Sequence, residues 1–333
     1  LEKILSSIKE LATLDNISKK YACIFKKFLE SYTDVIISHG EDPEISISIF
    51  ETFIKLFKIQ LENPFIFQPY HEKIRTPFDY YKFGIDFLRP LVNIKESTLT
   101  GKNNISTIKN VLKRGNNVIL FSNHQIEADP QAISILLEDD YGSLAENIIF
   151  VAGTRVTSDP LAIPFSMGRN LLCIHSKKYI NTPIEEKHAK QIHNKRTMQK
   201  MADLLAEGGK IIFVAPSGGR DRLNENNFIE VSPFDYRSIE MFYLMSKKSQ
   251  KKTHFYPLSL STHHLLPPPE TIEVELGEQR LTRGGAIHMH FGDEIDMELT
   301  TYQNIIPCSK NKRQARSEYI WDLVNKEYQK FPK

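Results

Sequence analysis

The stretch NVILFSNHQIEADPQAISILLED, residues 117–139, contains the pattern that best predicts the fold of this chain. It opens with a short apolar run, NVILF, passes through a polar turn and ends in an amphipathic segment, PQAISILLED. A strand that gives way to a helix is the unit from which α/β sheets are built. His124 and Asp129 lie at this junction, where one turn brings a histidine and a carboxylate into the same neighbourhood.

The same alternation continues along the chain. Further short β-rich runs occupy residues 147–152, 210–215, 253–260, 271–276 and 286–291, and helical patterns occupy residues 106–115 and 197–209. Alternating strands and helices predict parallel strands, whereas late strands that follow one another closely predict antiparallel ones. We therefore expect an α/β fold with a mixed parallel/antiparallel sheet flanked by helices.

The first 62 residues have a different pattern. Apolar side chains recur at three- and four-residue spacing in three successive sets, which is typical of amphipathic helices. The stretch SHGEDPE separates the second set from the third, and NPFIFQP ends the third. We predict a small N-terminal helical bundle domain over residues 1–77, acting as a scaffold or lid, and an α/β catalytic domain over residues 78–333.

Composition excludes several classes of protein. The chain has 333 residues, 41% of them hydrophobic and 25% charged, with a net charge of +2, which is typical of a soluble globular protein and not of a nucleic-acid binder. No apolar run reaches the ~20 residues that span a bilayer. Three scattered cysteines form neither a disulfide framework nor a metal site, so we expect no metal and no cofactor. We predict a reducing compartment, the bacterial cytoplasm, with the plastid stroma as the alternative.

Ligands of α/β sheets bind beyond the carboxyl ends of the strands, which directs attention to three loops. In the first loop Asp129 could accept a hydrogen bond from one nitrogen of His124, which would leave the other nitrogen as a base. The alternatives are that Asp129, before Pro130, caps the helix and that His124 only satisfies a turn.

The third loop, VAPSGGRDRLN at residues 214–224, has a tight turn with Gly218 and Gly219. Arg220 and Arg222 alternate, so in extended backbone they point to the same side. Two guanidinium groups beside a glycine turn suit a phosphate or carboxylate. The alternative is a solvated basic turn in which Asp221 cancels part of the charge.

The middle segment, residues 151–180, combines cations with an apolar stretch, LAIPF. Its cations are Arg155, Arg169, Lys177 and Lys178. An apolar wall beside cations suits a ligand with an apolar part and an anionic part. An apolar groove could be lined by Leu161, Ile163, Phe165 and Met167, although these residues could equally belong to the core.

Three blocks together resemble one family: NHQIEAD, VAGTRVTSDPLAIPFSMGRNLLCIHSKK and IIFVAPSGGRDR. The chain resembles the soluble, plastid-type glycerol-3-phosphate 1-O-acyltransferases, which also occur in bacteria, from about residue 75 to the C-terminus. The resemblance implies acyl transfer from an acyl carrier protein thioester, or from acyl-CoA, to the sn-1 hydroxyl of glycerol 3-phosphate. The product would be 1-acylglycerol 3-phosphate, in the first step of phospholipid synthesis.

The resemblance also implies roles. His124 would be the general base and Asp129 would orient it, as the HX4D motif of the family requires. The phosphate would be bound by Lys178, Arg220 and Arg222, with additional contacts from Arg155, Gly218, Gly219 and Tyr179. Tyr179 stands where plant members commonly have histidine, and it can donate a hydrogen bond but carries no charge.

The chemistry agrees with these roles, because a hydroxyl needs a base whereas a thioester is already activated. With no GxSxG motif, we expect direct attack and no acyl-enzyme. The alternatives are another phosphorylated acceptor, such as 1-acylglycerol 3-phosphate, and a non-catalytic protein that binds an acyl carrier or a phospholipid.

An acidic acyl carrier protein needs a basic docking face. Three segments are rich enough in Lys and Arg, at residues 187–196, 247–252 and 310–316. Each could equally be a solvated charged surface.

Overall fold

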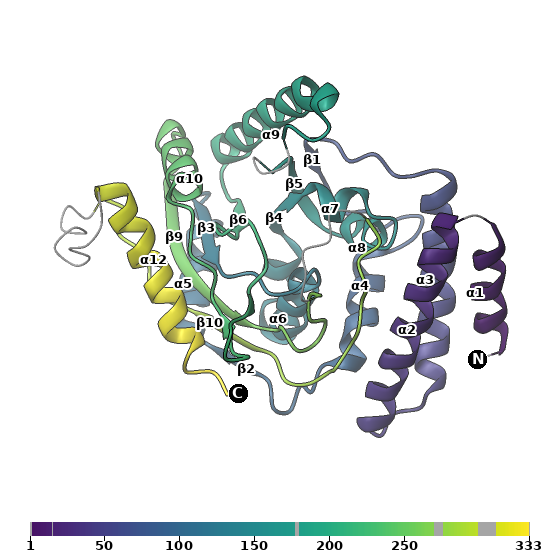
Figure 1. Cartoon of the computed structure of the whole chain (residues 1–333). Coiled ribbons are helices and arrows are strands. Elements are labelled where there is room, and N and C mark those ends of the chain that lie inside the picture. Colours follow the sequence, from purple (N-terminus) through teal and green to yellow (C-terminus); the bar gives the residue numbers. More distant parts are fainter. Residues whose placement is uncertain (1, 15, 177–179, 270–275, 299–310, 333) are drawn as a thin grey trace.

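The computed structural model describes residues 2–14, 16–176, 180–269, 276–298 and 311–332. Within these residues the strands form an eight-stranded sheet and a separate two-stranded ribbon (Figure 1). In spatial order the large sheet contains β1 (Tyr70–His71), β5 (Asn170–Ile174), β4 (Ile148–Gly153), β6 (Ile211–Val214), β3 (Asn117–Ser122), β9 (Thr253–Ser261), β10 (His288–Phe291) and β2 (Thr98–Thr100). The ribbon pairs β7 (Arg222–Leu223) with β8 (Ile229–Glu230).

The middle of the sheet is parallel. β5, β4, β6, β3 and β9 run in one direction, whereas β1 is antiparallel to β5 and β10 is antiparallel to β9. The prediction of a mixed sheet with a late antiparallel pair is therefore confirmed. The carboxyl ends of β3, β4 and β6 lie at one edge, so the three loops selected from the sequence emerge side by side there.

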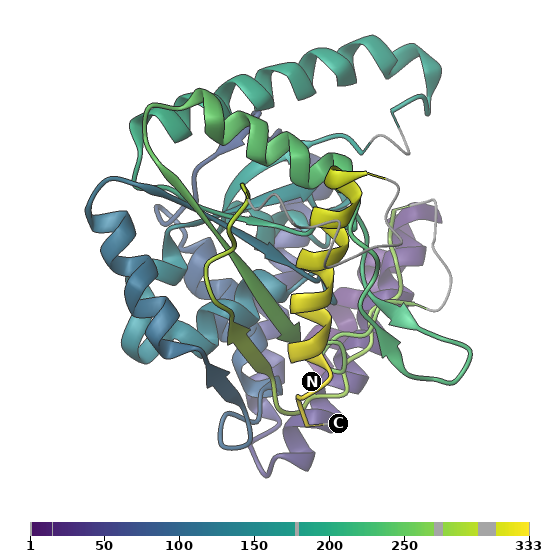
Figure 2. The ribbon, with the colours of Figure 1, turned by 90° about the vertical axis from the view of Figure 1, so that its left-hand side faces the viewer.

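Helices cover both faces of the sheet (Figure 2). One face packs against α9 (Lys187–Glu207), α10 (Tyr236–Lys248) and α12 (Lys312–Tyr328). The other packs against α5 (Lys102–Lys113), α6 (Asp129–Glu146) and α8 (Ile163–Met167). Strand residues alternate between the two cores: Val118 and Leu120 face one, and Ile119 and Phe121 face the other. Because both faces are buried, these strands read as continuous apolar runs.

The N-terminal helices follow the predicted order. They are α1 (Glu2–Leu14), α2 (Asn16–Ser38) and α3 (Glu44–Glu62), at one end of the molecule in Figure 1. Their core is largely aromatic and is shared with α4 (Tyr80–Leu88), as Phe28, Phe50 and Phe53 of the bundle contact Phe87. The Phe53–Phe87 pair is edge-to-face and the other two pairs are tilted, and such ring contacts stabilise an apolar core beyond the effect of area alone.

Short elements complete the chain: the 3-10 helices at Arg89–Leu91 and Ile184–Glu186, and the one-turn helix α7 (Thr154–Ser158). The strand predicted at residues 271–276 falls almost entirely outside the described residues. No helix within the described ranges is long and apolar enough to cross a membrane.

Candidate active site

His124 and Asp129 are in contact at the carboxyl end of β3. His124 Nδ1 lies 2.8 Å from Asp129 Oδ2, and the two side chains are 29% and 1% exposed. An ionised carboxylate can only accept hydrogen bonds, so Nδ1 carries the proton and Nε2 is left with its lone pair. The arrangement therefore presents one basic nitrogen on a partly exposed ring, held in position by a buried carboxylate.

Asp129 has two further donors. Its Oδ2 also accepts from the Gln125 backbone N–H at 2.8 Å, and its Oδ1 accepts from the Thr262 hydroxyl at 2.6 Å. The helix α6 begins at Asp129 with Ala128 in the capping position, so the alternative that Asp129 caps this helix is wrong. The carboxylate is used instead to connect the histidine loop to Thr262, just after β9.

Asp221 joins the first loop to the third. It is fully buried and accepts from Asn123 Nδ2 at 2.9 Å, from Gln125 Nε2 at 3.3 Å and from the Ser232 N–H at 2.9 Å. Its own N–H donates to the His124 carbonyl oxygen at 2.6 Å. Burial raises the pKa of the Asp221 carboxyl to about 6, although the hydrogen bonds oppose this. Asp221 is therefore an internal connection between the loops, and not a surface charge that cancels the arginines.

The arginines of the third loop lie near Arg155 of α7. Arg220 Nη2 contacts both carboxylate oxygens of Glu278, at 2.5 and 2.8 Å, and Arg155 Nη1 lies 2.6 Å from Glu278 Oε2. Arg222 donates through Nη1 to the carbonyl oxygen of Pro269. Burial lowers the pKa of the Arg222 guanidinium, and the charge of Arg220 adds to that effect.

The other predicted phosphate contacts are divided between described and undescribed residues. Gly218 adopts φ +65°, a backbone conformation that glycine permits at no steric cost, and its N–H donates to Ala215 O. Lys178 and Tyr179 lie outside the described residues. Arg169 is buried over the Tyr81 ring, donates to the Ser134 hydroxyl and lines the apolar pocket, so it is not part of the arginine cluster.

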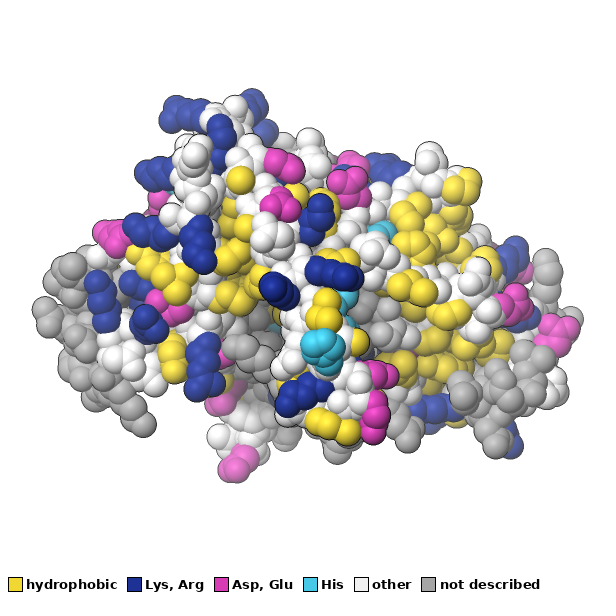
Figure 3. All heavy atoms as spheres, turned by 90° about the horizontal axis from the view of Figure 1, so that it is seen from above, with side chains coloured by type: hydrophobic (Ala, Val, Ile, Leu, Met, Phe, Trp, Pro, Cys, Tyr) yellow, Lys and Arg dark blue, Asp and Glu magenta, His cyan; other side chains and the backbone are white. Residues whose placement is uncertain are grey.

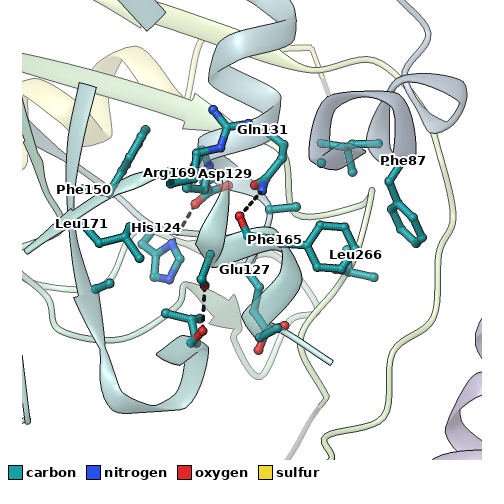
Figure 4. A pocket seen from close by; sticks show the side chains of 18 of the residues that line it. Phe87, His124, Glu127, Asp129, Gln131, Phe150, Phe165, Arg169, Leu171 and Leu266 are labelled. Carbon is teal, nitrogen blue, oxygen red and sulfur yellow. Dashed lines mark hydrogen bonds and ion pairs between the residues drawn. The ribbon is translucent and has the colours of Figure 1, made fainter. Parts of the chain in front are cut away.

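An apolar pocket of about 150 Å³ opens beside the histidine. In Figure 4 the His124 ring and Asp129 carboxylate are joined by a dashed line, with Phe150 and Leu171 on one side and Phe165, Leu266 and Phe87 on the other. Leu161 and Phe165 line this pocket as predicted, whereas Ile163 and Met167 pack into the core between α8 and the sheet. Phe28 of α2 also reaches the wall, so the N-terminal helices contribute to the pocket.

A second buried network lies beside the pocket. Arg280 donates to Glu127 Oε2 at 2.9 Å and to Asp159 Oδ2 at 3.2 Å, and Asp159 also accepts from Tyr21 of α2. Burial alone would lower the pKa of the Arg280 guanidinium, but the two carboxylates raise it above its ordinary value. The guanidinium therefore stays charged, and it fixes the chain after residue 276 to the first and middle loops.

Comparisons with known proteins show which family the chain belongs to. A family model described as Acyltransferase matches residues 97–261. The chain is 35% identical to the chloroplastic glycerol-3-phosphate acyltransferase of Spinacia oleracea, over 98% of this chain and 70% of the relative. It is also 35% identical to that of Arabidopsis thaliana, over 98% and 72%. The chain belongs to the glycerol-3-phosphate acyltransferase family.

Other relatives give a consistent result for this acyltransferase. The chloroplastic enzyme of Phaseolus vulgaris is 37% identical, over 98% of this chain and 71% of the relative. Among solved structures, the 1-acyl-sn-glycerophosphate acyltransferase PlsC from Thermotoga maritima aligns with a TM-score of 0.41 and 15% identity, over 76% of this chain and 78% of that one. That structural likeness is too distant to support an argument about the site.

Several residues of this acyltransferase site were not identified from the sequence. Gln125 and Thr262 donate to Asp129, and Glu278 accepts from Arg220. Asn123 donates to Asp221, which connects the first and third loops. Asn123 and Gln125 flank His124 as polar residues directly after an apolar strand, which was an available signal. Thr262 lies 133 residues from Asp129, and Glu278 lies 123 and 58 residues from Arg155 and Arg220. Neither residue is part of a motif.

Proposed function

We propose that this acyltransferase transfers a fatty acyl chain from an acyl carrier protein thioester to the sn-1 hydroxyl of glycerol 3-phosphate. The observation that supports this most strongly is the contact between His124 Nδ1 and Asp129 Oδ2, which lines an apolar pocket and lies on a loop bonded to the arginine-bearing loop through Asp221. The acceptor has a phosphate and a hydroxyl, and the donor has an apolar chain and a thioester. In this proposal the arginine cluster binds the phosphate, the pocket binds the apolar chain, and His124 lies where the hydroxyl meets the thioester.

In the proposed reaction His124 Nε2 accepts the proton of the sn-1 hydroxyl as its oxygen attacks the thioester carbonyl. Asp129 holds the imidazole in the tautomer with Nδ1–H and stabilises the positive charge that develops on the ring. The C–O bond forms, the C–S bond breaks when the tetrahedral intermediate collapses, and the proton on His124 passes to the leaving thiolate. No acyl-enzyme forms in this sequence.

The acceptor phosphate would lie against Arg220 and Arg222, with Arg155 and Lys178 as further cations. Guanidinium groups bind phosphate oxygens in pairs, which fixes orientation as well as charge. An acceptor held in this way presents its far hydroxyl toward the histidine loop, because Asp221 connects the two loops directly.

The acyl chain would enter the apolar pocket formed by the sheet, α4, α6 and α8. Its lining is aromatic and aliphatic, with Phe87, Phe150 and Phe165 prominent (Figure 4). Burial of each methylene contributes about 0.8 kcal/mol, so a pocket of this kind can hold a chain without any charged contact.

Topology favours one of the three basic segments as the docking face for the carrier. Residues 247–252 precede Thr253, which pairs with Asn117 at the amino end of β3, so they lie roughly 20 Å from the His124 edge. Residues 311–316 open α12, whose other end approaches the site, since Ser259 near the end of β9 donates to Val324 O.

The remaining segment opens α9. Residues 187–196 lie at the carboxyl end of β5, where His193 contacts Cys173 O and Asn194 accepts from the His175 N–H. Figure 3 looks down on this helix and shows basic side chains along it, and His188, Lys195 and Arg196 are exposed. We propose that the carrier docks on this segment.

The compartment in which the enzyme works stays a prediction: the bacterial cytoplasm, with the plastid stroma as the alternative.

The test is transfer of a labelled acyl chain from acyl carrier protein or acyl-CoA, with glycerol 3-phosphate, 1-acylglycerol 3-phosphate or glycerol as acceptor. Wild type is expected to use glycerol 3-phosphate and not glycerol, and His124→Ala is expected to lower kcat by about 100- to 10,000-fold. Activity that survives in folded His124→Ala would refute the base assignment. Incubation with donor alone should add no acyl mass to the protein; a stable acyl adduct would refute direct attack.

A further inference from the structure

Glu278 is a buried carboxylate that holds two arginines from different parts of the chain. Arg155 comes from α7 and Arg220 from the loop after β6, and both contact the same Glu278 carboxylate within 2.8 Å. Without that carboxylate the two guanidinium groups would repel one another. Glu278 therefore determines that these two cations lie close together.

The depth of the three side chains shows which of them can face a ligand. The Glu278 side chain is 2% exposed, whereas those of Arg220 and Arg155 are 13% and 26% exposed. The arginines are therefore more accessible to solvent than the carboxylate that pairs with them. A ligand can contact the exposed parts of the arginines while Glu278 stays buried.

Glu278 is itself fixed from behind. Its backbone carbonyl accepts from Arg280 Nη1 at 2.9 Å, and Arg280 is ion-paired to Glu127 and Asp159. The N–H of Gly277 donates to Asp159 Oδ2 at 3.1 Å. The short segment at residues 277–280 is therefore anchored to both the histidine loop and the middle segment, so its carboxylate has a defined position.

The net charge of the arginine cluster and Glu278 indicates which class of ligand they can bind. Arg155, Arg220 and Arg222 interact electrostatically with one another and with Glu278, and together they leave an excess of two positive charges. A phosphate monoester carries a charge between about −1.5 and −2 near pH 7. The cluster with Glu278 present therefore matches a phosphate monoester more closely than three unpaired arginines would.

We propose that Glu278 is a positioning residue that preorganises Arg155 and Arg220 to bind the phosphate of the acceptor. This inference rests on the proposed function of the arginine cluster. Glu278 touches neither the reacting hydroxyl nor the thioester, so it acts on the affinity for the acceptor and not on the chemical step.

The experiment measures glycerol 3-phosphate binding by calorimetry, together with KM and kcat, for wild type and Glu278→Gln. Loss of a charge-assisted bond that orients both arginines should raise Kd and KM by about tenfold, with kcat within about twofold of wild type. Unchanged Kd would overturn the proposal, and so would tighter binding, which would mean that Glu278 competes with the phosphate.

Glu240→Gln is the matched control. Glu240 is also a buried carboxylate that pairs with two arginines, Arg313 and Arg316 of α12, away from the pocket. Its variant should lose stability but keep the affinity for glycerol 3-phosphate. Equal loss of affinity in both variants would mean that the effect of Glu278 is a general effect of stability, and would overturn the positioning role.

Two further measurements deal with a Glu278→Gln variant that does not fold and with a wild type that does not bind the acceptor. If Glu278→Gln does not fold, Glu278→Asp retains the charge but cannot reach both arginines, and several-fold weaker binding is expected; wild-type affinity would refute the proposal. If folded wild type does not bind glycerol 3-phosphate at all, the proposed function itself fails, which is a different outcome from unchanged binding in the variant.

Discussion

At the scale of single residues, the site depends on two buried carboxylates, Asp129 and Asp221, which each accept several hydrogen bonds. Asp129 accepts from a ring nitrogen of His124, a backbone N–H and a hydroxyl. The last two bonds hold the carboxylate in place, and the carboxylate in turn orients the imidazole. Asp221 accepts from two side-chain amides and a backbone N–H. The first carboxylate orients the His124 imidazole, and the second connects the first loop to the third.

Thr262→Val should lower kcat by about tenfold and leave KM for glycerol 3-phosphate nearly unchanged. The valine keeps the shape but removes the hydroxyl that donates to Asp129 at 2.6 Å, which leaves a buried carboxylate oxygen without that partner. Steady-state kinetics check this. Thr197→Val removes an equally buried hydroxyl bond, to Cys173 O, and should leave kcat intact. A similar loss in both variants would contradict the specific role of Thr262.

Asp221→Asn should change the pH dependence of stability. The pKa of Asp221 is raised to about 6 in the folded protein from an ordinary 3.8, so folding favours its protonated form. The contribution of this group to stability is present below pH 4 and is lost as the pH rises through 6. Two pKa units correspond to about 3 kcal/mol.

The measurement for Asp221 is urea unfolding of both proteins between pH 4 and pH 7.5. The free energy of unfolding of wild type should fall relative to that of Asp221→Asn across this range. A constant difference between the two proteins would show that the Asp221 carboxyl is not shifted.

At the scale of elements, the pocket wall combines helices that are distant in sequence. α2 supplies Phe28, α4 supplies Phe87 and α8 supplies Phe165, and Phe87 contacts both of the other two rings. The pocket is therefore bounded by the N-terminal helices as well as by the sheet.

Phe28→Leu should extend the range of acyl donors toward longer chains. The smaller side chain opens space at the α2 wall, and each added methylene that enters it contributes up to about 0.8 kcal/mol. Relative kcat/KM over a series of acyl chain lengths measures the shift. Phe25→Leu removes a ring of equal size from the same helix, but one packed against Phe53 and Phe57 of α3 and not against the pocket. Identical chain-length profiles in both variants would contradict this assignment.

At the scale of the whole molecule, the helical bundle shares one core with helices α4 and α6 and with loop residues of the α/β part. A single cluster of buried residues runs from Ile4 and Phe25 through Leu88 to Leu161 and Leu265. The boundary predicted between residues 77 and 78 crosses this cluster. Two parts that bury their apolar surfaces against one another are expected to unfold together.

We therefore predict a single unfolding transition for the full chain. Trp321 is the one tryptophan, and it lies on α12, which is separated by the sheet from α1 to α3. Its fluorescence should give the same urea midpoint as far-UV circular dichroism, which reports all helices. Two separate midpoints would show that the bundle unfolds independently, as an autonomous domain of residues 1–77 would.

The sequence predicted the parallel strands β3, β4, β6 and β9, because each is buried on both faces and reads as a continuous apolar run. It did not predict β5, since Asn170–Ile174 follows the polar turn MGR and was read as part of a loop. β1 and β2 have two and three residues, too few for any periodicity. Their positions depend on pairing partners that lie far away in the chain.

For the site, too, residues with a local sequence signal could be predicted, and residues that depend on distant partners could not. His124 and Asp129 follow β3, and Arg220 and Arg222 follow β6, each within eight residues of the strand, where local sequence is sufficient to suggest chemistry. Glu278 and Thr262 could not be predicted, because their importance arises only when the fold brings distant segments together. Asp221 was read as a charge in solvent, and only its burial shows that it connects two loops.

The wall that α2 and α4 give to the pocket has a consequence for how such an enzyme can diversify. The described helices α1 to α4 carry no member of the His124–Asp129 pair or of the arginine cluster. Substitutions there can reshape the pocket while the His124–Asp129 contact and the arginine cluster stay as they are. Under the proposed function, preference for one fatty acid over another can therefore change in descendants of this chain without passing through an inactive intermediate.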